Sequence, residues 1–156
     1  MATWNELHAA EPAFADAVRT RLDAYVHKTL ATVRADGSPR ISGTEVQLID
    51  GDLWIGSMWQ ARKAHDLQRD PRFALHSGSD SPPDWTGDAK LAGLAVEVTD
   101  PETVLRINGE HAAAGPTHLF RLDLREVSTV TLAAGGKEIE IAVWTPGAPI
   151  RRQHRA

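Results

Sequence analysis

The chain contains 156 residues, a length typical of one domain that can build its own core. Its 17 Lys and Arg and 21 Asp and Glu residues give a formal net charge of −4, which argues against a general nucleic-acid binder. The absence of Cys excludes disulfides, thiolate zinc sites, iron–sulfur clusters and a Cys nucleophile. The longest apolar stretch, residues 91–96, is too short to span a membrane, and no secretory signal is visible, so we expect a cytoplasmic protein.

Residues 1–26 are expected to form a helical segment. Pro12 is tolerated in a first helical turn, and the apolar residues that follow it recur at helical spacing. These residues are Phe14, Val18, Leu22 and Tyr25.

Three extended runs are expected next, over residues 29–34, 39–49 and 53–58. The first alternates apolar and polar residues and ends at Asp36-Gly37, a pair typical of tight hairpin turns. The second ends at Asp50-Gly51, which is the same kind of turn signal. Tight turns between three successive strands predict an antiparallel meander.

The remaining chain combines short strands with two further helices. A helix is expected over residues 61–69, because Pro71 disfavours helical backbone at the residue before it. Another is expected over residues 101–109, with Asp100 as its N-cap and Gly109 at its end. The other expected segments are strands at 73–77, 89–99, 118–124, 127–133 and 138–144, a loop at 78–87 and a basic tail at 146–156.

These segments predict one domain of the mainly β, α+β class over residues 1–156. The alternation of strand and helix that marks a doubly wound parallel sheet is missing. Many short strands with frequent turns favour a closed antiparallel barrel, because closure removes exposed strand edges. The few short helices are then expected to flank this barrel.

The segment with the most chemical information is residues 57–65, Ser-Met-Trp-Gln-Ala-Arg-Lys-Ala-His. A strand ends there, and Arg62 and Lys63 fall in the first turn of a helix, whose N-terminus already carries positive partial charge. Two cations at that place make sense if they and free backbone N–H groups bind one anion, such as a phosphate. On the residues alone, an ordinary solvated helix face is an equally good interpretation.

The same segment also resembles a known family. The run Ala61-Arg62-Lys63-Ala64-His65, followed by Asp70-Pro71-Arg72, is similar to the phosphate-binding segment of the pyridoxamine 5′-phosphate oxidase-like split barrels. Other pieces agree in order and spacing: residues 30–39 resemble the first hairpin of that family, 41–48 its second strand and 53–58 its third. The likeness runs from about residue 25 to residue 99, and residues 144–147 (Trp-Thr-Pro-Gly) resemble the end of actinobacterial members.

The resemblance implies a homodimeric split β-barrel with a flavin or deazaflavin between the subunits. Arg62 and Lys63 would bind the cofactor phosphate, and Trp144 would line the cofactor slot or belong to the core. The strand residues implied beside the cofactor are Ser57 and Met58 on the third strand, and Ser42, Gly43, Thr44 and Glu45 on the second. The vitamin-forming oxidase has Arg in place of Ser42. This difference favours the broader reductases, which use FMN or, in actinobacteria, the deazaflavin coenzyme F-420.

The expected activity is that of an oxidoreductase acting on a small organic substrate. The cofactor would supply the hydride chemistry, so no catalytic residue is assigned. Two alternatives stay open: a non-catalytic module of the same fold that binds flavin or haem, and a β-barrel interaction protein without a cofactor. Seven His residues lack the spacing of a zinc site, and no metal site is assigned. Trp59, Trp85 and Lys90 stay open between roles at the site and structural roles.

Overall fold

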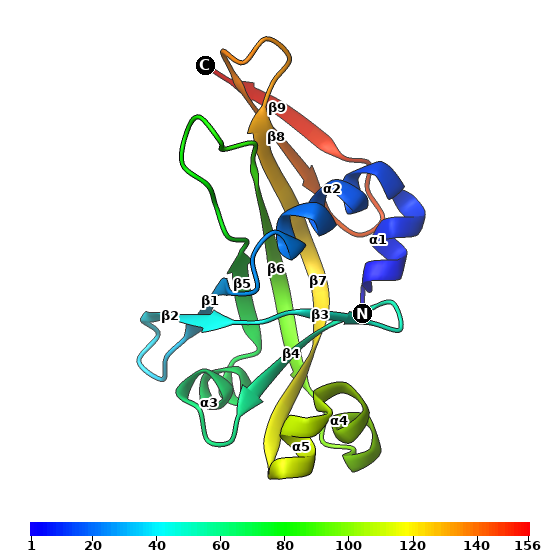
Figure 1. The fold of residues 1–156 in the computed structure, drawn as a ribbon, viewed down its shortest axis with the longest axis vertical. Helices are drawn as coiled ribbons and strands as arrows, with labels where there is room; N and C mark the ends of the chain where they lie inside the picture. The colour runs from blue at the N-terminus through cyan, green and yellow to red at the C-terminus, as the bar shows by residue number, and fades with distance from the viewer.

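The computed structural model describes residues 1–156, which form a nine-stranded antiparallel sheet with five helices around it (Figure 1). The helices are α1 (Trp4–Ala10), α2 (Pro12–Asp23), α3 (Arg62–Arg69), α4 (Pro101–Asn108) and α5 (Glu110–Ala114). The strands are β1 (Lys28–Val33), β2 (Pro39–Thr44), β3 (Gln47–Ile49), β4 (Asp52–Met58), β5 (Arg72–His76), β6 (Asp88–Glu97), β7 (Thr117–Leu132), β8 (Ile139–Trp144) and β9 (Arg151–Arg155). None of the helices has the length and apolar character that crossing a membrane requires.

The expected mainly β, antiparallel class is confirmed, but the sheet is not closed. Strands follow the order β2-β1-β5-β6-β7-β4-β3, and β8 and β9 continue from β7 as a further hairpin. β2 and β3 end the path without pairing with each other, so the expectation of a closed barrel is wrong. The reason lies in the 16 residues of β7, because β4 pairs with its first part and β8 with its last part (Figure 1). The sheet therefore divides along β7, and the split barrel that the family resemblance implies is confirmed.

The expected meander of three strands is also wrong. β1 and β2 form the predicted hairpin around Asp36-Gly37, and β3 and β4 form a second hairpin around Asp50-Gly51, where both residues have positive φ. The extended run 39–49 is interrupted between β2 and β3, and β4 then pairs with β7. The two hairpins therefore lie at opposite ends of the sheet order, although they are neighbours in the sequence.

The strands expected over residues 118–124 and 127–133 are one strand, β7. In its pairing with β6, Glu126 lies opposite Ala92 and Leu124 lies opposite Gly93, so Arg125 between them has no partner residue on β6. Such a β-bulge bends a strand without ending it. Gly93 makes this close approach possible, because a Cβ there would lie 1.9 Å from the carbonyl oxygen of Asp123.

Two short elements, α5 and β9, were not expected from the sequence, and the expected helical segment 1–26 consists of two helices. The first of them, α1, is capped by the side chain of Thr3 and buries Trp4 and Leu7. α5 has five residues, none of them buried. β9 lies in the expected basic tail and pairs with β8, although all its residues are exposed.

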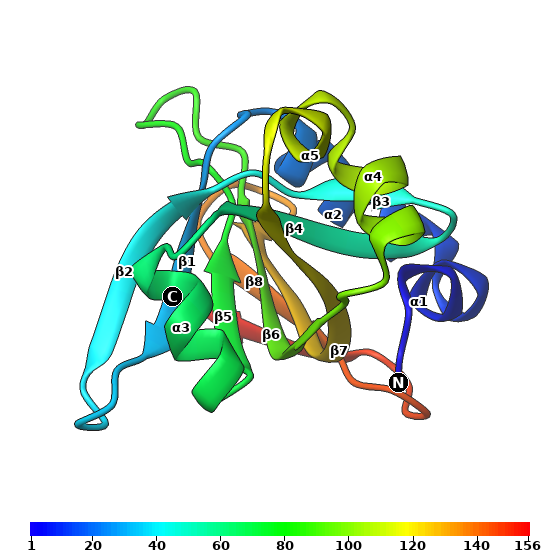
Figure 2. The ribbon, with the colours of Figure 1, turned by 90° about the horizontal axis from the view of Figure 1, so that it is seen from below.

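The core lies between the inner face of the sheet and the helices α1, α2 and α3. A cluster of 23 buried apolar residues joins these elements. A smaller cluster of Trp54, Ile107 and Leu119 fixes α4 against β4 and β7. As a result, α3 lies beyond the end of β4 on one side, and the α4–α5 pair lies on the other (Figure 2).

Candidate functional site

The ends of β2 and β4, the start of α3 and the segment from α5 into β7 surround a cavity of about 820 Å³. This volume is typical of small-molecule pockets. Of the residues implied by the family resemblance, those that line it are Gly43, Thr44, Glu45, Ser57, Met58 and Lys63. The fold therefore brings the ends of β2 and β4 together at one cavity, although β2 and β4 do not pair with each other.

Lys63 brings positive charge to this cavity. Its Nζ donates a hydrogen bond to the carbonyl oxygen of Gly43 at 2.7 Å, and it has no carboxylate partner. Burial lowers the pKa of the Lys63 ammonium, because the charged form loses hydration. A desolvated cation without a counter-ion favours an anionic ligand.

Arg62 lies beside Lys63 but does not line the cavity itself. Its side chain is exposed and forms no hydrogen bond or ion pair. The N-cap residue Ala61 has no side-chain group to cap the first N–H groups, and no acidic residue occurs in the first turn. This turn thus has two cations where helices usually favour acidic residues, which again suits a bound anion.

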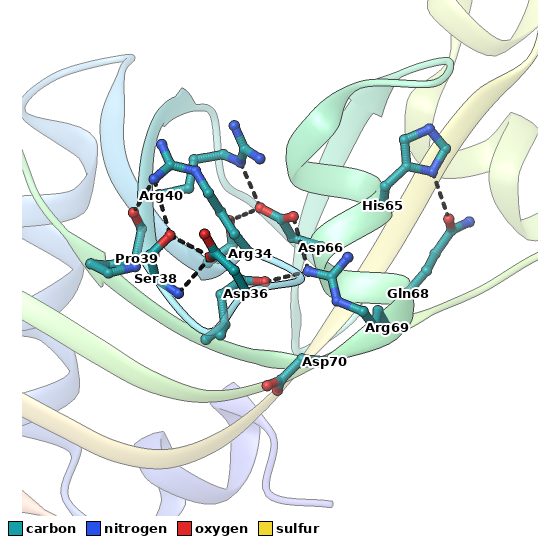
Figure 3. Close-up of polar contacts among 12 residues, drawn as sticks. Arg34, Asp36, Ser38, Pro39, Arg40, His65, Asp66, Gln68, Arg69 and Asp70 are labelled. Carbon is teal, nitrogen blue, oxygen red and sulfur yellow. Dashed lines mark hydrogen bonds and ion pairs between the residues drawn. The ribbon is translucent and has the colours of Figure 1, made fainter.

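Asp66 ties α3 to the first hairpin (Figure 3). Its buried carboxylate accepts hydrogen bonds from Thr32 Oγ1 at 2.8 Å, Arg40 Nε at 2.6 Å and Arg69 Nη2 at 3.1 Å. Burial alone would raise the pKa of Asp66, but the hydrogen bonds and the charge of Arg40 together lower it. One ionised carboxylate therefore holds the end of β1, the start of β2 and α3 together, and Lys63 at the start of the same helix contacts Gly43 near the end of β2.

A buried histidine holds the turn between β4 and α3. His118 Nδ1 lies 2.6 Å from Glu97 Oε1, and Nε2 accepts a hydrogen bond from the backbone N–H of Gln60 at 3.2 Å. Gln60 has a φ of 60°, an unfavourable conformation for a residue with a side chain, and this hydrogen bond helps to stabilise it. Trp59 stacks on the His118 ring with 4.7 Å between centroids and lines the cavity. The structure thus assigns Trp59 a place at the site.

Asn108 and Thr117 are two polar residues of the cavity that the sequence analysis missed. Asn108 is 7% exposed, and its Nδ2 donates to Thr117 Oγ1 at 2.8 Å and to the carbonyl oxygen of His118 at 3.2 Å. Gly56 leaves room for this amide, because a Cβ there would lie 2.8 Å from Asn108 Oδ1. In the sequence, Asn108 before Gly109 indicates only the end of a helix.

The remaining implied residues lie away from the cavity. Ser42 is half-buried on β2 opposite Leu30 and does not line it. Trp144 is 1% exposed in the main core, because β8 pairs with the end of β7 that is far from β4. Within one chain, Trp144 therefore takes the core role and not a place in the slot.

Lys90 and Trp85 also lie elsewhere. Lys90 borders a smaller depression of about 270 Å³ on the outer face of the sheet. Trp85, in the loop before β6, donates from Nε1 to Asp88 at 3.1 Å. No group of three or more His, Asp or Glu side chains is placed to hold a metal ion.

An open antiparallel split barrel with a cavity at its strand ends defines the fold class of this protein. The family model of pyridoxamine 5′-phosphate oxidase matches residues 14–131. The chain belongs to this family. No curated protein matches the chain significantly.

Several solved structures share the fold. A putative pyridoxamine 5′-phosphate oxidase from Listeria innocua is 19% identical, with a TM-score of 0.59 over 72% of this chain and 94% of that chain. A heme binding protein from Mycobacterium smegmatis is 20% identical, with a TM-score of 0.61 over 83% and 56% of the two chains. An F-420 reductase is 19% identical, with a TM-score of 0.54 over 70% and 94%. Identities this low establish the fold alone.

Proposed function

We propose that this chain binds FMN in the 820 Å³ cavity and acts as an oxidoreductase on a small organic substrate. The observation that carries the proposal is Lys63, a partly buried cation in the cavity with no carboxylate partner. Arg62 adds a second charge without a partner at the same helix start, which no side chain caps. A phosphate is the anion that suits such a donor set, because it accepts hydrogen bonds from cations and backbone N–H groups together.

The residues around the cavity fit the two parts of FMN. Arg62 and Lys63 would hold the phosphate, and Gly43, Ser57 and Met58 would lie along the ring. Bound FMN supplies the electron or hydride transfer. The chain would then bind and orient the cofactor and exclude water, and no protein acid or base is assigned.

The deazaflavin coenzyme F-420 is the second candidate for the same cavity, because it also joins a phosphate to a flat ring system. The structural likeness to an F-420 reductase supports this alternative. A third outcome is a non-catalytic module that binds haem. His27 and His111, which both line the cavity, support that reading, since imidazole is a common axial ligand.

We also propose that the chain works as a homodimer with the cavity at the subunit interface. On the outer face of the sheet, Ile41, Ala31, Ala74 and Ala92 lie in one row across β2, β1, β5 and β6, and Ile41 is 75% exposed. At the rim of the cavity, Met58 is 80% exposed. The row on the sheet and the Met58 side chain are apolar and uncovered in one chain, and a second copy would bury them. Ile41→Arg is expected to give a monomer, which sedimentation velocity would detect. The monomer is expected to bind the cofactor more weakly.

The test of the proposed activity starts from the purified chain. Its visible spectrum is recorded alone and during titration with FMN, F-420 and haem. Quenched flavin fluorescence on binding, followed by reduction with NADH or NADPH and reoxidation by an added substrate, is the expected result. Binding without reduction would indicate a carrier or sensor, and a haem Soret shift with no flavin binding would indicate the haem module. Binding of none of the three would contradict the proposal.

A further inference from the structure

Asn108 presents a single free hydrogen-bonding atom to the cavity. The carbonyl oxygen of His118 can only accept, so the amide nitrogen of Asn108 must face it, and this fixes the orientation of the amide. Both amide hydrogens are then used, one by His118 and one by Thr117. The Oδ1 atom has no partner in the chain and is not enclosed by protein. Asn108 therefore offers the cavity an acceptor and no donor.

Thr117 offers the complementary group. Its Oγ1 accepts from Asn108, so its hydroxyl hydrogen stays free to donate, and Thr117 also lines the cavity. The two residues come from α4 and from the first position of β7, and their mutual hydrogen bond holds them side by side. The wall of the cavity thus carries a fixed acceptor beside a donor.

We infer that Asn108 and Thr117 bind a ligand edge in which an N–H group adjoins a C=O group, as in a lactam or an imide. An acceptor beside a donor is the complement of that edge, and an acceptor that a ligand covers without pairing carries a desolvation penalty. This inference rests on the proposed function, because the rings of FMN and F-420 both carry an imide. Haem has no such edge.

The position of the pair along β4 agrees with a ligand that also carries an anion. Asn108 faces Gly56, and Thr117 pairs with Met58, the last residue of β4. The chain then turns into α3, where Lys63 lies. The acceptor and donor thus lie on the strand side of the cavity and the cation on the helix side, so the ring and the phosphate of one ligand would be recognised separately.

The test compares FMN with its N3-methyl analogue, which lacks the imide N–H, and uses the corresponding F-420 pair if F-420 is the cofactor bound. The unaltered chain should bind the methyl analogue about ten- to a hundredfold more weakly, because Oδ1 is then buried without a partner. Asn108→Ala should bind both compounds with similar affinity. Thr117→Val should weaken binding of the parent cofactor about tenfold, whereas Thr117→Ser keeps the hydroxyl and should bind like the unaltered chain.

The outcomes separate this inference from the proposed function. If the unaltered chain binds both compounds equally, or if Asn108→Ala still discriminates between them, the inference is overturned while cofactor binding stands. If neither cofactor binds, or if Lys63→Gln leaves FMN affinity unchanged, the proposed site fails first and the inference fails with it. Should Asn108→Ala not fold, the Thr117→Val and Thr117→Ser pair decides, and equal affinities in those two variants overturn the inference.

Discussion

Replacing Asp66 with Asn should destabilise the protein and weaken cofactor binding together. The Asp66 carboxylate accepts three hydrogen bonds, two of them from guanidinium groups, and its side chain is 4% exposed. Asn keeps one oxygen but removes the charge and turns an N–H group toward a cation. The link between α3 and the first hairpin is then lost (Figure 3), in the same helix that carries Lys63.

The expected magnitude follows from the exposure of the partners. Breaking a buried ion pair typically costs about 3–5 kcal/mol. The side chains of Arg40 and Arg69 are 24% and 41% exposed, so both can regain some hydration, and the lower end, about 3 kcal/mol, is appropriate. For a chain of this size, that corresponds to a fall in Tm of about 6–12 °C.

Thermal unfolding followed by circular dichroism measures this effect. The matched control is Asp70→Asn, which removes the same charge at the end of the same helix from an exposed pair with Arg72, where solvent screens the interaction. The control should change Tm far less than Asp66→Asn. Equal losses of stability in the two variants would refute the assigned role of Asp66.

The pH dependence gives a second check on the same carboxylate. The pKa of Asp66 is lowered in the folded state, so its contribution is present above the unfolded value of about 3.9 and is lost as pH falls through the folded pKa. The difference in unfolding free energy between the unaltered chain and Asp66→Asn should therefore shrink over that acid range. A difference that stays constant below pH 4 would contradict the ionised state of Asp66.

Three further predictions concern the cavity. The pKa of Lys63 is lowered by burial, so affinity for FMN should fall as pH rises through that lowered pKa, and Lys63→Gln should remove this dependence in a fluorescence titration. Gly56→Ala should displace the Asn108 amide, which lies 2.8 Å from the added Cβ, and lower the unfolding free energy by about 1–3 kcal/mol in urea; an unchanged midpoint would contradict the close contact. His118→Phe keeps the aromatic ring but removes the acceptor for the Gln60 N–H, so faster amide hydrogen exchange at Gln60 is expected, and unchanged exchange would contradict that hydrogen bond.

The local elements of this fold could be predicted because their signals are local. Asp36-Gly37 and Asp50-Gly51 specify tight turns, and Asp100 caps α4 through the Thr103 N–H. Strand pairing could not be predicted in the same way. β4 pairs with a strand about sixty residues later, and no signal within either strand records that register. The bulge at Arg125 is equally hidden, because a break in alternation resembles a turn until its partner strand is known.

In the candidate site, too, residues with a local sequence signal could be predicted and residues brought together by long-range contacts could not. The Arg62 and Lys63 pair was identifiable because two cations at a helix start contradict the usual charge preference. Asn108, Thr117 and His118 were not, since each is an ordinary residue that gains a role only when α4 and β7 close on β4. Trp144 shows the limit of a resemblance confined to a short motif. Its side chain fills the core of this chain.

The measurement that tests the central claim most directly is the affinity of three proteins for FMN, by fluorescence and calorimetric titration. They are the unaltered chain, the Arg62→Gln/Lys63→Gln variant, and the charge-matched control Arg151→Gln/Arg152→Gln in β9. Each charge-assisted hydrogen bond lost is worth about 1.5–3 kcal/mol, so the first variant should bind at least a hundredfold more weakly. The control, on an exposed strand away from the cavity, should bind like the unaltered chain. Equal affinity of a folded Arg62→Gln/Lys63→Gln variant would contradict the phosphate site at the start of α3.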